Sequence, residues 1–137
     1  MTNARLAREV GLSESATLER VRRLESSGVI SGYAARVEPR QVGRDLEVFM
    51  GFTLKHQKPE DLSRFGSAMS QLDEVLGCAQ VLGRFDFIAH IAVKDVASLE
   101  AFINDKLLPL GFIDRMESLT VLKMLKRAFP PLPLQGL

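Results

Sequence analysis

The stretch "LEVFMGFTL", residues 46–54, decides the fold, because its apolar side chains recur with a period of two. Successive side chains of a strand point to opposite faces of a sheet. One face is therefore apolar throughout, with Leu46, Val48, Met50, Phe52 and Leu54. Phe49 places an apolar ring on the other face. We expect a strand that is buried on one face and partly apolar on the other.

The residues that follow predict two repeats of helix and strand. Pro59 favours the start of a helix, and apolar residues follow it at helical spacing: Leu62, Phe65, Met69 and Leu72. "VLGCAQVL" (75–82) and "DFIAHIAV" (86–93) predict two strands joined by a turn. Asp95 is a suitable cap for a second helix, whose apolar stripe is Leu99, Phe102, Ile103 and Leu107. "MESLTVLKML" (116–125) predicts the closing strand.

The resulting order, βαββαβ, is that of a ferredoxin-like sandwich in the α+β class, with four antiparallel strands and both helices on one face. The other face would be open to solvent. Phe49 in the first strand and Leu119 and Val121 in the last make that face apolar as well. Since monomers rarely expose such a surface, we expect a homodimer, the commonest symmetric assembly.

The charge divides the chain into two parts. Residues 1–44 carry eight arginines and five glutamates, whereas residues 45–137 carry ten basic and twelve acidic side chains. We therefore expect two domains, 1–44 and 45–137. The basic first part suggests an acidic partner such as nucleic acid, although a solvated helical surface would give a similar count.

Two helices are predicted in the first part. Helical spacing runs from Asn3 to Gly11, and Ser13 is a good N-cap for a second helix that extends to Gly28. This is the spacing of a helix-turn-helix, whose second helix enters the major groove of double-stranded DNA. The side chains expected at the DNA are Ser13, Ser15, Ala16, Glu19, Arg20, Arg22 and Arg23. An ordinary helical hairpin has the same periodicity, so the spacing leaves both interpretations open.

"GVISGYAARVEPRQVG", residues 28–43, predicts a short strand, a glycine turn and a second strand, as in a wing, before the chain becomes a linker. The C-terminal "FPPLPLQGL", residues 129–137, has no periodicity. We expect it to lie along a partner or to be disordered.

The segments "LAREVGLS" and "RVRRLE", the following "GVI" and "GY", and the turn "GRFD" occur in an order that closely resembles the Lrp/AsnC family of transcription regulators. The resemblance covers nearly the whole chain. It implies a winged helix-turn-helix, an effector domain that dimerises through its sheet, assembly of dimers into octamers, and an amino acid or related metabolite as effector. In the family another helix precedes the position of Asn3. The sequence begins without it, and we expect Leu6, Val10, Val21 and Leu24 to lose part of their cover.

The resemblance also implies the effector site. The glycine-x-x-aspartate turn would line a pocket between subunits, where Asp86 pairs with an ammonium group and Arg84 with a carboxylate of the ligand or of a neighbouring subunit. The residues expected there are Gly83, Arg84, Phe85, Asp86, Val96, Ser118, Leu119 and Thr120. A charged hairpin tip with a flexible glycine accounts for the same residues as a simple turn.

Other functions have weaker support. Proteins resembling siroheme decarboxylases share this fold but carry histidine and arginine on the pocket strand, and "VLGCAQVLG" has neither. With no paired carboxylates, no nucleophile constellation and no zinc-ligand spacing, we expect no enzyme, cofactor or metal. A further alternative is an effector-binding partner protein without DNA binding. Cys78, the one cysteine, should be buried in its strand. We expect a cytoplasmic protein, since no stretch resembles a membrane span or a signal peptide.

Overall fold

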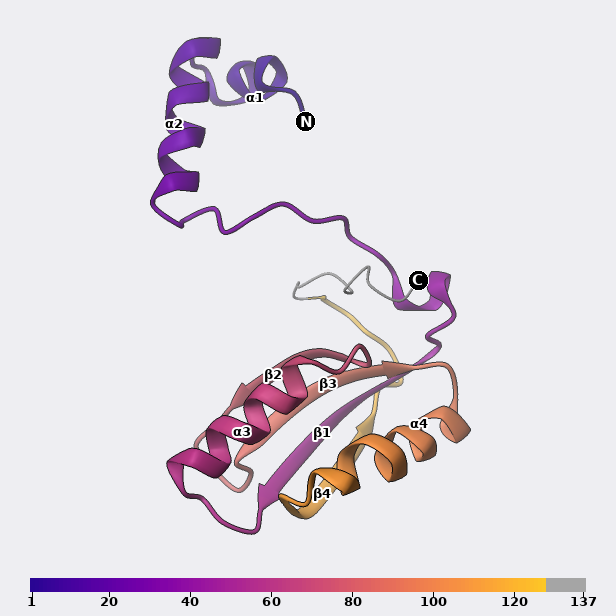
Figure 1. The fold of residues 1–137 in the computed structure, drawn as a ribbon. Coiled ribbons are helices and arrows are strands. Elements are labelled where there is room, and N and C mark those ends of the chain that lie inside the picture. The colour runs from indigo at the N-terminus through magenta and orange to yellow at the C-terminus, as the bar shows by residue number, and fades with distance from the viewer. Residues whose placement is uncertain (128–137) are drawn as a thin grey trace. The chain divides into compact units, whose positions relative to one another are not determined.

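The computed structural model describes residues 1–127, which form two compact units divided between Ala35 and Arg36 (Figure 1). The predicted first domain extends to residue 44, but in the structure residues 36–44 belong to the second unit. The expectation for residues 129–137 lies outside the described residues.

The first unit contains the two predicted helices, α1 (Asn3–Val10) and α2 (Glu14–Ser26). The α1 helix ends because Gly11 adopts a left-handed conformation with φ of 68°, which costs glycine little. Ser13 starts α2 by accepting a hydrogen bond from the backbone N–H of Ala16 at 3.2 Å. The predicted helix ends and the N-cap are thus confirmed.

The two helices bury little between them. Ala7 and Thr17 are the buried residues of this unit, and the Thr17 hydroxyl donates to the carbonyl of Ser13. An apolar groove of about 240 Å³ remains, lined by Leu6, Val10, Leu12, Thr17, Arg20, Val21 and Leu24. Val10 and Leu24 beside this groove are 52% and 40% exposed.

The predicted wing strands are wrong. Within the described chain, residues 27–38 contain no strand, and the linker instead forms a short 3-10 helix, η1 (Pro39–Val42). Val29 and Tyr33 are 72% and 75% exposed. An isolated pair of strands is marginal in water unless its apolar side chains pack against something. These residues have side chains typical of strands, but within the described chain they have no apolar surface against which to pack.

The second unit is the predicted βαββαβ sandwich. Its elements are β1 (Leu46–Leu54), α3 (Pro59–Ser70), β2 (Val75–Gln80), β3 (Phe87–Val93), α4 (Val96–Phe102) and β4 (Ile113–Thr120). A π-helical turn, η2 (Ile103–Leu107), and a 3-10 turn, η3 (Leu108–Leu110), continue α4. The sheet order is β2-β3-β1-β4, and all three pairings are antiparallel.

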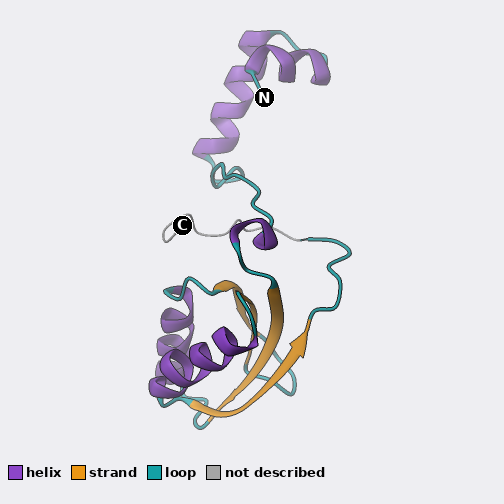
Figure 2. Ribbon diagram, turned by 90° about the vertical axis from the view of Figure 1, so that its right-hand side faces the viewer, coloured by secondary structure: helices purple, strands orange, loops and turns teal. Residues whose placement is uncertain are grey.

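Both long helices lie on one side of the sheet (Figure 2). The alternating side chains of β1 face them, and Val48, Met50 and Phe52 are fully buried. The helical stripes complete this core, with Phe65 and Met69 buried on α3 and Phe102 and Leu107 on the second helical segment. Asp95 caps α4 as predicted, accepting from the N–H of Ser98 at 2.8 Å.

Two details differ from the sequence prediction. The last strand runs from Ile113 to Thr120 and not to Leu125, because its ladder ends where Val121 donates to the carbonyl of Glu47. The chain then leaves the sheet. Cys78 is exposed on β2 rather than buried, because β2 is an edge strand with a neighbour on one side only.

Candidate functional site

The first candidate site is the exposed side of α2. Ser15 lies in its first turn and is exposed, and Ala16 beside it is half-buried. Small side chains at this position allow the N-terminal end of a recognition helix to approach base edges. The side-chain amide of Asn3 donates to the carbonyl of Glu14 at 2.8 Å, which ties the start of α2 to α1.

All three predicted DNA-binding arginines and Glu19 lie along the same helix. Arg22 and Arg23 are exposed, and Arg23 lies 3.5 Å from Glu19. Because both side chains of that pair are about three-quarters exposed, the pair is weak, and Arg23 can exchange it for a phosphate. Arg20 differs from the others, since its side chain borders the apolar groove.

The second candidate site is the turn between β2 and β3, whose closing residue is Asp86. Its backbone carbonyl accepts from Val81 N at 3.0 Å, and its own N–H donates to the carbonyl of Phe52 at 2.8 Å. The carboxylate oxygen Oδ2 accepts from the backbone N–H of Leu54 at 2.8 Å and from Gln57 Nε2 at 3.3 Å. Oδ1 has no hydrogen-bond partner among residues 1–127. Asp86 therefore holds the end of β1 with one oxygen and keeps the other unengaged.

The preceding residues of the turn lie over the open sheet face. The Phe85 ring covers Gly51, where a Cβ atom would come within 2.6 Å of the ring. The guanidinium of Arg84 sits 4.7 Å from the centre of the Phe85 ring and binds Glu117 of β4. Arg84 was expected to meet a carboxylate of a ligand or of a neighbouring subunit; in the structure its carboxylate comes from the same chain. Gly83 has φ of 152°, a region that favours glycine.

The remaining predicted effector residues do not converge within one subunit. Leu119 pairs with Phe49 and is 58% exposed on the open face. Ser118 and Thr120 pair with Met50 and Val48, so they lie on the helix side of the sheet. Val96 begins α4 beyond the other end of β3, whose seven residues span roughly 20 Å. Inside a single subunit, Val96 is therefore remote from the turn.

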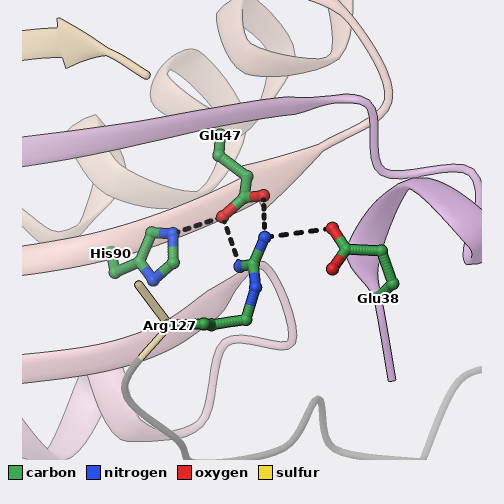
Figure 3. A network of polar contacts seen from close by, with 4 residues as sticks. All are labelled: Glu38, Glu47, His90 and Arg127. Carbon is green, nitrogen blue, oxygen red and sulfur yellow. Dashed lines mark hydrogen bonds and ion pairs between the residues drawn. The ribbon is translucent and has the colours of Figure 1, made fainter. Parts of the chain in front are cut away.

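A third polar cluster was missed by the sequence prediction (Figure 3). Glu47 of β1 is 7% exposed and binds His90 of β3 at 2.7 Å and Arg127 at 2.9 Å. Hydrogen bonds from Arg127 lower the pKa of the Glu47 carboxyl against the opposing effect of burial, and those from His90 lower it further. The same carboxylate raises the pKa of the Arg127 guanidinium. The available signal for this cluster was Glu47, a charged residue within an alternating apolar strand. Its partner Arg127 is 80 positions away in the sequence.

Within residues 1–127, no cluster of three or more metal-ligating side chains occurs. Among the helices of that part of the chain, none is both long and apolar enough to cross a membrane.

Residues 47–131, more than half of the chain, match the Lrp/AsnC ligand binding domain, and residues 1–31 match a winged helix-turn-helix DNA-binding family. The leucine-responsive regulatory protein of Klebsiella pneumoniae is 34% identical over 128 residues, which cover 93% of this chain and 78% of that protein. The protein of the same name from Escherichia coli K12 is 33% identical over the same coverage.

Solved structures agree with these sequence matches. A transcriptional regulator from Neisseria meningitidis, crystallised with L-methionine, has a TM-score of 0.87 and 29% identity, covering 98% of this chain and 86% of its own. A feast or famine regulatory protein of Mycobacterium tuberculosis, also with L-methionine, has a TM-score of 0.81 and 31% identity, covering 96% and 87%. The chain therefore belongs to the Lrp/AsnC family of ligand-responsive transcription regulators, and it is a DNA-binding regulator, not an enzyme.

Proposed function

We propose that this regulator responds to an L-amino acid or a related metabolite that binds at a subunit interface beside the turn Gly83–Asp86. Two of its structural neighbours hold L-methionine, and its curated relatives are named as leucine-responsive. The α-ammonium group shared by all such ligands is a hydrogen-bond donor, and Asp86 Oδ1 is an unengaged acceptor among the described residues. That oxygen is the observation that carries the proposal.

The placement of Val96 supports a site made by more than one subunit. Val96 and Asp86 lie beyond opposite ends of β3, so a pocket containing both requires two copies of the chain.

The assembly we propose is a homodimer through the open sheet face. Phe49, Ile88 and Leu119 are 37%, 39% and 58% exposed there, and they come from three neighbouring strands. A second copy would remove this apolar surface from water, in keeping with twofold symmetry. Assembly of dimers into octamers is an expectation from the family resemblance.

For DNA, we propose that α2 enters the major groove. Ser15 and Ala16 would approach base edges, while Arg22 and Arg23 contact phosphates, with Ser13, Glu19 and Arg20 flanking them. The proposed compartment is the cytoplasm, where duplex DNA and free amino acids are both present in bacteria.

Native mass spectrometry with a panel of L-amino acids that includes methionine and leucine tests the effector and the assembly together. We expect an even number of subunits, with L-amino acid bound to the oligomer and none to the monomer. Ligand retained by a dissociated monomer would contradict the interface site. A monomer at micromolar concentration would contradict the dimer.

A further inference from the structure

Three separate parts of the chain meet around the Glu47–Arg127 pair, near the start of β1 (Figure 3). His90 comes from β3, Glu38 from the linker, and Arg127 from the segment that follows β4. Arg127 Nη1 lies 2.9 Å from Glu47 Oε2, and Nη2 lies 2.9 Å from Oε1. One planar guanidinium therefore engages both oxygens of a single carboxylate, the geometry for which arginine is suited.

Burial makes this contact necessary for Glu47. The side chain is 7% exposed, and a buried carboxylate without a cationic partner is strongly unfavourable. His90 reaches Oε2 alone at 2.7 Å and is itself held by stacking on Phe49, with ring centres 4.7 Å apart. Oε1 depends on Arg127. The ion pair with the buried Glu47 carboxylate therefore holds the segment that carries Arg127 against the sheet.

The same guanidinium also reaches the linker. Nη2 donates to Glu38 Oε1 at 3.0 Å, and Glu38 is the residue that immediately precedes η1. Within η1, the N–H groups of Gln41 and Gly43 donate to the carbonyls of Glu38 and Arg40, and Arg44 N donates to Pro39 O. Arg127 therefore ties the residue before η1 to the sheet. It acts beside two other contacts of the linker: Pro39 is buried, and Arg44 Nη1 donates to the carbonyl of Asp73 at 2.7 Å.

We propose that Glu38, Glu47 and Arg127 form a latch that fixes the linker, and with it the point at which the chain leaves the effector domain toward the DNA-binding unit. Arg127 is a positioning residue in this latch. When it releases, the start of η1 loses this attachment to the sheet, and the linker around η1 gains conformational freedom. Any event that moves the segment 121–127 then changes how firmly the linker around η1 is held. The latch goes beyond the proposed function, because it requires neither an effector nor DNA.

Hydrogen–deuterium exchange of the full chain tests the latch. In Arg127→Gln, we expect the amides of Gln41, Gly43 and Arg44 to exchange about tenfold faster, as for loss of one charge-assisted hydrogen bond at the low end of its range. The amides of the β1–β3 ladder should keep their protection. Faster tryptic cleavage after Arg40 and Arg44 should accompany the change.

Two further variants make the result decisive. Arg84→Gln removes the other arginine–glutamate pair of the open face and should leave linker exchange unchanged. Glu38→Ala removes the acceptor of the linker arm and keeps Glu47 paired, so it should accelerate the linker amides while the Val121 amide, bonded to the Glu47 carbonyl, remains protected. If Arg127→Gln does not fold, Glu38→Ala decides alone. Unchanged linker exchange in the folded variants, or an equal increase across the whole sheet, would overturn the latch.

Discussion

Arg84 and Glu117 join the turn between β2 and β3 to the opposite edge of the sheet. Nη2 of Arg84 lies 2.8 and 2.9 Å from the two carboxylate oxygens of Glu117, and β4, which carries Glu117, is separated from β3 by β1. The turn therefore folds across the open face, over Gly51, instead of projecting away from it. This places Asp86 at the boundary between the turn and the apolar surface proposed for dimerisation.

We predict that the Arg84–Glu117 pair contributes little to stability. The two side chains are 69% and 48% exposed, so water and salt screen their attraction. Arg84→Gln and Glu117→Gln should each lower the free energy of unfolding by less than about 1 kcal/mol, as measured by urea denaturation. A substantially larger loss would mean that the turn is held by this pair and not by the backbone bonds of Asp86.

The arginines of α2 should contribute to DNA binding without reading sequence. Arg22→Ala and Arg23→Ala should each weaken binding to all duplexes and reduce the slope of log K against log salt by about one unit. Fluorescence anisotropy with a labelled duplex at several salt concentrations measures both quantities. Arg64→Ala, an exposed arginine on α3, is the matched control and should change neither. Unaltered affinity in the double variant would exclude this face of α2.

Dimerisation should require the exposed side chain of Leu119 but not that of Leu108. Leu119 on β4 and Leu108 in η3 are 58% and 50% exposed, but only Leu119 lies on the open sheet face. Leu119→Glu would bury a charge in the proposed interface, and we expect monomers by analytical ultracentrifugation at micromolar concentration. Leu108→Glu should sediment like the unaltered chain. If both variants sediment alike, the interface lies elsewhere.

Glu47 should make stability depend on acid pH. Its pKa is lowered from the ordinary value of 4.5, first by the hydrogen bonds of Arg127. The folded state therefore favours the charged form. This contribution is fully present above the unfolded pKa and is lost as pH falls through the lower folded pKa. Relative to Glu47→Gln, the unaltered chain should be more stable at pH 7, and the difference should shrink as pH falls below 4.5. A difference that stays constant down to pH 2 would contradict the pairing.

Local pattern predicted the second unit well. The alternation in β1, the stripe of α3 and the Asp95 cap depend on neighbouring residues and on periodicity, and all three are confirmed. The wing strands failed because strand composition does not reveal whether a packing surface exists. Val29 and Tyr33 have suitable side chains and nothing to cover.

The polar contacts of the site could not be predicted in this way. Glu47 and Arg127 are 80 positions apart, and Arg84 and Glu117 are 33 apart. Only the folded sheet brings them together, and no periodicity links such distant residues. Asp86 was predicted as a ligand contact from resemblance, but its bond to Leu54 N depends on the register of β1 against β3.

Isothermal titration of L-methionine into the Asp86→Asn variant tests the effector site most directly. The asparagine carbonyl can still accept from Leu54 N, so the fold should persist, while the negative charge proposed to face the ligand is lost. We predict an affinity lower by about ten- to a hundredfold, as for loss of about 1.5–3 kcal/mol from a charged hydrogen bond. Asp73→Asn, at the other end of β2, should bind like the unaltered chain. A lower melting temperature with unchanged L-methionine affinity in Asp86→Asn would show that Asp86 serves only to close the turn.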